Sequence, residues 1–202
     1  MHRGSLIVLE GMQLSGVSSV AKRLANDFKN VVVLEFPNNA GPFSNLTSGY
    51  SSGWLNINPS AGHYLMSADI WNRVPEIIGL LKHGNTVVCD RYCYSEMVKT
   101  MVLGGIKWSW CRLSECGLPK PDLVIFLEAT PITIKSRQSI STANHYEHYL
   151  EQVYQKFHHV KWLEANWIEI NTNIMTLDEV YRRVFDLVWD EVSSTRNALS
   201  FI

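Results

Sequence analysis

The sequence predicts an α/β fold in which helices enclose a five-stranded parallel sheet. Five short apolar runs alternate with helix-like stretches, and each run is almost continuously hydrophobic, as is typical of parallel strands buried on both faces. The chain has 202 residues, 46% of them hydrophobic, which suffices for one domain with a substantial core. Because it contains no internal repeat, low-complexity tract or long linker, we expect a single domain over residues 1–202.

The expected elements follow one another in regular order along the chain. The strands are Leu6–Leu9, Val31–Phe36, Thr86–Cys89, Leu123–Leu127 and Trp167–Ile170. The helices are about Val20–Phe28, Ala61–His83, Ser95–Leu103, Ile132–Ser139, Glu147–Ala165 and Leu177–Ser194. Pro75 should kink the second helix or mark a bend, and Trp108 and Trp110 lie in a loop or at a helix start. The alternation implies right-handed crossovers and ligand sites at the carboxyl ends of the strands.

Charge and hydropathy argue against two classes of partner. The net charge is −1 and the pI is about 6.6, so the basic surface typical of nucleic-acid binding is missing. No apolar run approaches the roughly 18 residues of a membrane span. We therefore expect no nucleic acid and no membrane as partner. The first residues lead directly into a core strand, so we expect no cleaved signal peptide and a cytoplasmic protein.

The cysteines support an intracellular location. They lack paired C-x-x-C spacing, so we expect reduced thiols rather than disulfides or zinc ligands. They are Cys89, Cys93, Cys111 and Cys116.

A glycine-rich turn follows the first strand. From Gly11 to Ser18 its spacing matches G-x-x-x-x-G-K-[ST], a loop whose backbone N–H groups cradle phosphate at a helix N-terminus. The lysine of that pattern, which would reach the outer phosphates, is replaced by Val17. The expected phosphate-loop residues are Gly11, Ser15, Gly16, Ser18 and Ser19. An ordinary turn between a strand and a helix is the alternative interpretation.

A charged tripeptide, Asp90-Arg91-Tyr92, follows the third strand. It would place a carboxylate and a guanidinium at the edge of the sheet where ligands bind. The carboxylate can face a metal-bound water and the guanidinium a phosphate, although a structural ion pair would also explain the two charges. The sequence indicates no metal site firmly. If Mg²⁺ binds, we expect Ser18, Asp90 and Glu128 to hold it.

Several motifs together resemble one family. The decisive run is Gly117–Glu128, in which two prolines precede a buried strand. The others are L-I-V-L-E-G at Leu6–Gly11, the pair Phe36-Pro37, S-A-x-x-W at Ser67–Trp71 and D-R-Y-x-x-S at Asp90–Ser95. In consistent order over about residues 3–190, these motifs resemble thymidylate kinases, particularly their poxviral and eukaryotic branch, so we expect a viral protein.

The resemblance implies a P-loop nucleoside monophosphate kinase fold that moves the γ-phosphoryl group of Mg-ATP onto dTMP. It implies a lid at about residues 137–146, with Asp90, Arg91 and Arg137 as the surviving catalytic positions. The implied substrate contacts are Phe36, Pro37, Met66, Trp71, Tyr92 and Tyr146. It also implies a homodimer in which the helix Ala61–His83 packs across a two-fold axis. An apolar stripe for that interface could consist of Tyr64, Leu65, Ile70, Ile77, Ile78 and Leu81.

The chain departs from this family where the family directs charge toward phosphate. In chain order, Gln13 replaces Asp, Leu14 replaces Arg or Lys, Val17 replaces Lys, Asn39 replaces the Arg that holds the dTMP phosphate, Asp69 replaces Asn, Ile70 replaces Arg and Glu96 replaces Gly. In the lid, the family's arginine aligns with His145 or is absent, and no Lys or Arg lies between Arg137 and Lys156.

These losses weigh against catalysis. One well-placed arginine accelerates phosphoryl transfer by about 10³–10⁵, and one lost oxyanion donor costs roughly 10²–10³ in rate. We therefore expect a catalytically inactive family member, a pseudoenzyme without a cofactor, repurposed to bind a host or viral protein in the host cell cytoplasm. Two alternatives stay open. One is an active or residual kinase that uses Mg-ATP with Asp90, Arg91, Glu128 and Arg137, and the other is a nucleotide-binding sensor without turnover.

Overall fold

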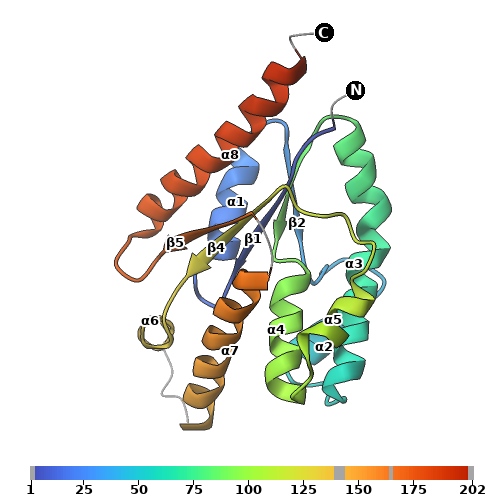
Figure 1. Ribbon diagram of the computed structural model, residues 1–202, viewed down its shortest axis with the longest axis vertical. Helices are drawn as coiled ribbons and strands as arrows, with labels where there is room; N and C mark the ends of the chain where they lie inside the picture. Colours follow the sequence, from blue (N-terminus) through green and yellow to red (C-terminus); the bar gives the residue numbers. More distant parts are fainter. Residues whose placement is uncertain (1–2, 139–143, 164–165, 200–202) are drawn as a thin grey trace.

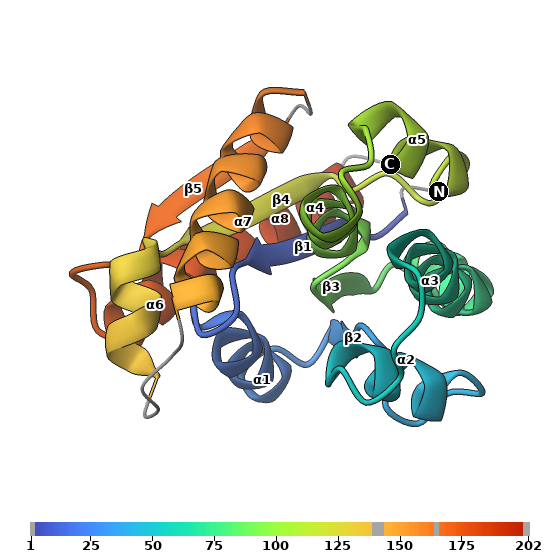
Figure 2. The same cartoon turned by 90° about the horizontal axis from the view of Figure 1, so that it is seen from below.

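The structure is a computed structural model that describes residues 3–138, 144–163 and 166–199. A five-stranded parallel sheet, in the order β2-β3-β1-β4-β5, carries helices on both faces (Figures 1 and 2). The predicted fold class is thus confirmed. The strands are β1 (Leu6–Gly11), β2 (Val31–Glu35), β3 (Thr86–Asp90), β4 (Leu123–Glu128) and β5 (Trp167–Asn171). Every expected strand is present, and its ends differ from the expectation by at most two residues.

The described part of the chain forms eight helices, of which the sequence predicted six. They are α1 (Val17–Asp27), α2 (Ser44–Ser51), α3 (Pro59–Lys82), α4 (Cys93–Gly104), α5 (Trp108–Ser114), α6 (Pro131–Arg137), α7 (Asn144–Leu163) and α8 (Leu177–Leu199). The two that were not predicted are the short helices α2 and α5. Trp108 and Trp110 thus belong to α5, where both side chains pack partly buried against the core.

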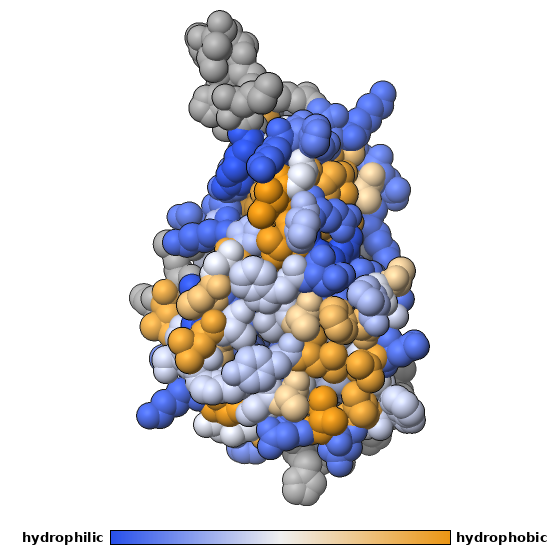
Figure 3. All heavy atoms as spheres, turned by 90° about the vertical axis from the view of Figure 1, so that its right-hand side faces the viewer, coloured by the Kyte–Doolittle hydropathy of each residue, from blue (hydrophilic) through white to orange (hydrophobic). Residues whose placement is uncertain are grey.

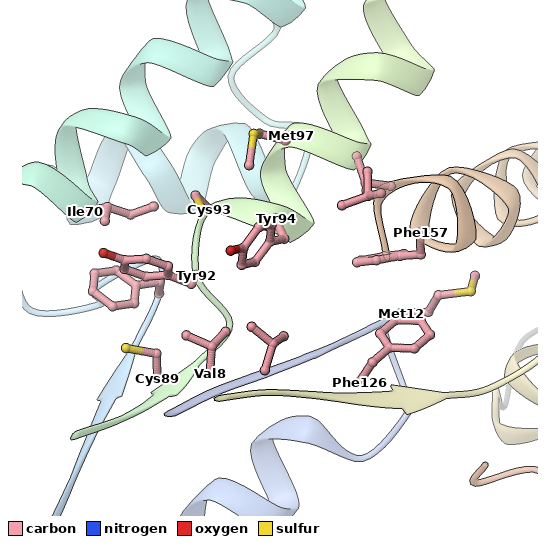
Figure 4. Packing of buried hydrophobic residues seen from close by; sticks show 14 of the residues in the cluster. Val8, Met12, Ile70, Cys89, Tyr92, Cys93, Tyr94, Met97, Phe126 and Phe157 are labelled. Atoms are coloured by element: carbon pink, nitrogen blue, oxygen red, sulfur yellow. The ribbon is translucent and has the colours of Figure 1, made fainter. Parts of the chain in front are cut away.

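Alternate residues of each strand serve two separate hydrophobic cores. Along β1, Leu6 and Val8 join the cluster that includes residues of α3, α4 and α7, whereas Ile7 and Leu9 join the cluster with α1 and α8. Because side chains alternate between two covered faces, the central strands β1, β3 and β4 appear in the sequence as nearly continuous apolar runs, whereas β5 at the sheet edge buries only Ile170. Figure 4 shows part of the first core, with Val8 on the sheet and Met97 on α4.

The carboxyl ends of the strands lie at one edge of the sheet. Leu9 of β1 pairs with Asp90 of β3, and Gly11 pairs with Leu127 of β4. The glycine-rich loop and the Asp90-Arg91-Tyr92 turn therefore leave the sheet beside each other, as expected for a parallel α/β fold.

Helix α3 continues through Pro75 without a break. Its start is fixed by Asn58, whose side chain accepts a hydrogen bond from Ser60 N at 2.9 Å, with Pro59 in the first turn. Pro75 lies on the exposed face, so the backbone hydrogen bond that it cannot donate is lost where water can replace it.

The predicted apolar stripe on α3 is wrong for half of its members. The buried members are Ile70, Ile77 and Leu81. They belong to the core cluster because this side of α3 packs against β3 and α4. Tyr64 and Ile78 are exposed, and the apolar residue exposed between them is Trp71. The exposed apolar residues thus follow a seven-residue spacing that the prediction did not identify.

The structure describes all four cysteines. Cys89, Cys93 and Cys111 are buried thiols and Cys116 is an exposed thiol. Within residues 3–138, 144–163 and 166–199, no group of three or more His, Cys, Asp or Glu side chains could hold a metal ion. In the same ranges, no helix is both long and apolar enough to cross a bilayer.

Candidate functional site

A cavity of about 330 Å³ lies at the carboxyl edge of the sheet. Its volume is at the lower end of the roughly 300–1,000 Å³ typical of small-molecule sites. Residues from the loops after β1, β2 and β3 and from helices α2, α3, α4 and α7 form its walls. They are Gly11, Met12, Gln13, Phe36, Pro37, Ser51, Met66, Asp69, Ile70, Arg91, Tyr92, Ser95, Glu96, Lys99, Tyr149, Val153 and Phe157.

One wall of the cavity is apolar and aromatic. The rings of Phe36 and Tyr92 meet edge to face with their centroids 5.9 Å apart, and Met66 and Ile70 of α3 complete the wall. Figure 4 shows Ile70 of α3 above the ring of Tyr92. The structure therefore brings together Phe36, Pro37, Met66 and Tyr92, four of the six substrate contacts that the family resemblance implies. A flat ring could lie against this surface.

Two cations line the cavity, and each faces a carboxylate. Arg91 Nη1 lies 3.8 Å from Asp90 Oδ1. Lys99 Nζ lies 3.9 Å from Glu96 Oε2 and 4.0 Å from the ring centroid of Tyr50. Sequence reasoning missed Lys99, although its position three residues after Glu96 on one helix could have indicated the pair.

Arg91 is also held by its backbone. Its N–H donates to the carbonyl of Leu9 at 2.9 Å, and its φ of 65° is uncommon for a residue other than glycine. Such strained positions gather at functional sites. The turn fixes the backbone of Arg91 beside the cavity, where its guanidinium faces Asp90.

Two carboxylates in the wall carry an oxygen without a hydrogen-bond partner. Asp69 is fully buried; its Oδ2 accepts the backbone N–H of Asn38 at 2.7 Å, while its Oδ1 has no partner in the described part of the chain. Glu96 is 8% exposed, and its Oε1 likewise has no partner there. Burial raises the pKa of Asp69, and it raises the pKa of Glu96 to about 7 against the lowering effect of Lys99.

Glu10, which sequence reasoning did not single out, fastens the cavity wall to the sheet. It ends β1 in full burial, where its carboxylate accepts the backbone N–H of Tyr92 at 3.0 Å and of Ser95 at 3.4 Å. The hydroxyl of Ser95 donates to its second oxygen. Burial raises the pKa of Glu10 to about 7, although these hydrogen bonds and Arg91 oppose the rise. Glu10 thus positions Tyr92 and Ser95 rather than facing a ligand.

The glycine-rich loop keeps its shape and lacks its charge. A Cβ on Gly11 would lie 2.4 Å from Ser15 Oγ and 2.8 Å from Leu127 O, so only glycine fits there. Helix α1 begins after Gly16, at φ 107°, without a side-chain cap, which leaves its first N–H groups directed at the loop. Val17 is 2% exposed and packs in the core with α8. The amides of Ser18 and its neighbours suit a phosphate, but no fixed cation accompanies them.

Arg137 does not line the cavity, because its donors are engaged elsewhere. Its guanidinium donates to Leu14 O at 3.0 Å, to Thr172 O at 2.5 Å and to Thr172 Oγ1 at 3.3 Å. It therefore joins the glycine-rich loop to the turn after β5. Of the expected lid, residues 139–143 lie outside the described residues, as does the side chain of His145.

Two implied substrate contacts, Trp71 and Tyr146, are not among the residues that line this cavity. Trp71 points to α5, where its indole N–H donates to Ser114 O at 2.8 Å. Tyr146 accepts a hydrogen bond from Gln138 Nε2 at 3.3 Å, and the α7 residue that lines the cavity is Tyr149. In both cases another residue of the same helix faces the cavity instead. Ile70 replaces Trp71 on α3, and Tyr149 replaces Tyr146 on α7, because successive residues of a helix point in different directions.

The three expected magnesium ligands differ in whether their side-chain oxygens already have hydrogen-bond partners. Both carboxylate oxygens of Glu128 are engaged, one by Tyr154 Oη at 2.8 Å and one by Asn173 Nδ2 at 3.2 Å. Asp90 Oδ1 is buried without a hydrogen-bond partner in the described ranges, and it lies 3.8 Å from Arg91 Nη1. Ser18 is half-buried at the start of α1. Of the two carboxylates, only that of Asp90 therefore has an oxygen without a hydrogen bond, the kind of ligand that Mg²⁺ prefers.

Comparison with known proteins points to one family. A family model described as thymidylate kinase matches residues 9–184. A thymidylate kinase of Danio rerio is 30% identical over 192 residues, covering 92% of this chain and 90% of the relative. A putative thymidylate kinase of Invertebrate iridescent virus 6 is 29% identical over 205 residues, covering 99% and 94%. The solved thymidylate kinase of Candida albicans superimposes with a TM-score of 0.80 at 25% identity, covering 96% of this chain and 93% of that one.

Proposed function

The chain belongs to the thymidylate kinase family, and from this premise we propose that it has lost phosphoryl transfer and acts as a binding protein on the kinase fold. The observation that carries the proposal is the burial of Val17. It occupies the position of the phosphate-loop lysine and is 2% exposed in the core. No ammonium can therefore reach the outer phosphates of a nucleotide from this position.

The distribution of the remaining cations supports the same proposal. Catalysis of phosphoryl transfer depends almost entirely on positioning and on stabilising phosphate charge. Lys99 faces Glu96, Arg91 faces Asp90, and Arg137 is held by backbone and hydroxyl oxygens. A phosphate that entered the cavity would thus compete with carboxylates for both cations.

The residues present fit Mg-ATP only in part. The N–H groups at the start of α1 would hold a phosphate, and Ser18 with Asp90 would hold the metal, whose charge would partly offset that of the phosphates. The fixed lysine that orients the outer phosphates is missing, so we propose no resident cofactor. A nucleotide sensor that binds without turnover is the second candidate, favoured by the retained loop geometry around Gly11 and Gly16.

We further propose that the protein forms a homodimer through the exposed face of α3. Tyr64, Trp71 and Ile78, exposed by 53%, 37% and 39%, are spaced seven residues apart and so lie on one helix face. Figure 3, which views the side of the molecule where α3 lies, shows apolar patches there among polar residues. A second copy can offer the same stripe across a two-fold axis.

The proposed setting is the host cell cytoplasm, with a host or viral protein as regulatory partner. A viral relative of almost the same length supports a viral setting. The near-neutral net charge of −1 favours a protein partner over nucleic acid.

Steady-state turnover tests the loss of catalysis. Full-length protein is assayed with Mg-ATP and dTMP, and dTDP is followed by chromatography. We expect no dTDP above the level of a matched Arg91→Ala preparation, which would carry the same contaminating kinases. Turnover faster than about a hundredth of a typical 10 s⁻¹, abolished in Arg91→Ala, would contradict the proposal. Calorimetry with ATP and ADP, with and without Mg²⁺, identifies a sensor by binding without turnover.

A further inference from the structure

We propose that a surface groove formed by α4, α5 and α7 binds an acidic segment of a partner protein that also carries an apolar side chain. The groove has a volume of about 500 Å³ and shares none of its lining residues with the cavity at the carboxyl edge of the sheet. The inference rests on the binding role proposed above, and it names the surface and the partner chemistry for that role.

The end of α4 and the turn that follows it shape one side of the groove. Helix α4 ends at Gly104, and Gly105 has a φ of 62°, which stops the helix and turns the chain toward α5. A Cβ on Gly104 would lie 2.9 Å from Ile106 Cδ1, so the turn packs closely onto the helix end. Trp108 begins α5 directly afterwards. The remaining lining residues belong to α7, which packs against α4, and α4 lies between α7 and α5 (Figures 1 and 2).

The groove is basic although the protein as a whole is not. Lys107, Lys156 and His159 line it, and its described lining includes no Asp or Glu. The two α7 residues are three positions apart and therefore lie on the same side of that helix. Neither lysine forms an ion pair with a described residue, whereas Lys161, also on α7, pairs with Glu169. These lysines are therefore free to pair with carboxylates of a partner.

Apolar surface lines the same groove. It is supplied by Met101, Ile106, Trp108 and Leu163. Leu163 is 49% exposed, so an apolar side chain that covered it would remove hydrophobic area from water. Tryptophan and methionine are enriched where proteins contact one another, and a tryptophan at such a contact often carries much of the binding energy. The groove therefore suits a segment in which an apolar side chain accompanies acidic ones.

A protein segment fits this groove better than nucleic acid or a small anion does. Nucleic-acid sites neutralise several phosphates along a strand and draw on a strongly basic surface. The described lining has three basic side chains, Lys107, Lys156 and His159, on a chain whose net charge is −1. A small anion would contact the lysines and leave the apolar lining in water. Carboxylates joined to an apolar side chain use both kinds of surface.

Selection from a library of random dodecapeptides on the full-length protein tests the inference, and fluorescence anisotropy then measures the affinity of the enriched peptides. We expect these peptides to carry a net negative charge and a large apolar residue, and we expect salt to weaken their binding. Enrichment of no peptide, or of neutral or basic peptides only, would overturn the inference. So would tighter binding of single-stranded oligothymidylate or of inorganic triphosphate than of the best peptide.

Substitutions assign the binding to the groove. Lys107→Glu combined with Lys156→Glu should weaken the best peptide by about tenfold or more, because like charges would then meet. Leu163→Ala should weaken it by about threefold or more. The matched control is Lys22→Glu combined with Lys29→Glu, which changes the net charge equally at two exposed lysines outside the groove and should leave the affinity unchanged. An unchanged affinity in the double groove variant, with a native melting temperature, would overturn the inference.

The outcome is independent of the test for catalysis. Failure of peptide binding leaves the loss of turnover standing, because the groove and the cavity share no lining residue. Formation of dTDP in the kinase assay would contradict the loss of catalysis alone, since the peptide titration would still report on the groove.

Discussion

The side chain of Val17 lies inside the core that α1 and α8 share with the sheet. A lysine at this position would either bury its ammonium in apolar surroundings, at high cost, or leave the core and open a gap there. Valine therefore stabilises the start of α1 while it removes the charge that phosphate needs.

Val17→Lys is expected to destabilise the protein and to restore no kinase activity. The free energy of unfolding should fall by about 1–3 kcal/mol, as for a core substitution that introduces a charge. Kinase activity should not return, because the positions of Asn39 and Ile70 would still lack a cation. Urea denaturation and the dTDP assay measure the two effects. Val17→Met, which adds length without charge, is the control. Recovery of turnover by Val17→Lys alone would mean that the acceptor side had remained competent.

Glu96 combines deep burial with neighbours from several elements. Lys99 on its own helix favours its charged form, whereas Glu115, at the end of α5, disfavours it. Tyr50 of α2 and Tyr149 of α7 also face it, and its negative charge helps burial to raise the pKa of each tyrosine to about 12. Desolvation outweighs the attraction of the one lysine, so the pKa of Glu96 rises to about 7.

Stability should therefore fall as the pH rises from about 4.5 to 7. The carboxyl pKa of Glu10 and of Glu96 is raised from 4.5 to about 7, so between these values the folded protein binds more protons than the unfolded chain. Each group lowers the free energy of unfolding by up to about 3 kcal/mol over that window. Urea denaturation from pH 5 to pH 8 measures the fall. In Glu96→Gln it should be smaller by about 1–3 kcal/mol, and in Glu151→Gln unchanged. An equal fall in Glu96→Gln would contradict the burial argument.

Among the secondary-structure elements, the strands were predicted well. A strand whose two faces are both buried consists almost entirely of apolar residues, so it stands out in the sequence as an apolar run. It missed α2, whose polar sequence carries no helical apolar stripe. That helix is fixed by tertiary contact, since the ring of Tyr50 lies so close to Gly62 of α3 that a Cβ there would come within 2.0 Å of it. Such a contact cannot be inferred from periodicity within one segment.

The sequence located the cavity residues that directly follow a strand. It did not locate those on helices, where the rotation of the helix decides which side chains face the cavity. Arg91 and Tyr92 follow β3 directly, so the end of the strand locates them. Trp71 and Tyr146 were misplaced, since a rotation of about 100° per residue decides which side chain of a helix faces a cavity. Lys99 on α4 escaped notice for the same reason.

The exposed apolar stripe of Tyr64, Trp71 and Ile78 on α3 predicts a dimer that should dissociate when a charged residue is introduced into the stripe. Ile78→Glu should yield a monomer, because two buried carboxylates would meet across the two-fold axis. Ile174→Glu, at the exposed turn before α8, is the matched control, since Ile174 is 93% exposed and off the stripe. Sedimentation velocity distinguishes the two states. A wild-type monomer, or a dimer that persists in Ile78→Glu, would show that this face of α3 is not the interface.

Over the whole molecule, the two cores and the parallel sheet of the family fold are present, and we propose that charge directed at phosphate has been lost from this frame. The glycines and buried strands are needed for folding, so they remain whatever ligand is bound. The charged positions are needed only for chemistry, and at Val17 and Ile70 core packing has taken their place. The fold and the activity of such a protein can therefore separate.

Single-turnover chemistry tests this separation most directly. Protein in excess over labelled dTMP is mixed with saturating Mg-ATP, so that each dTMP molecule that binds is counted and slow product release has no influence. We expect the label to remain in dTMP. Formation of dTDP with a rate constant above about 0.1 s⁻¹, a hundredth of a typical turnover number, and its loss in Arg91→Ala would contradict it.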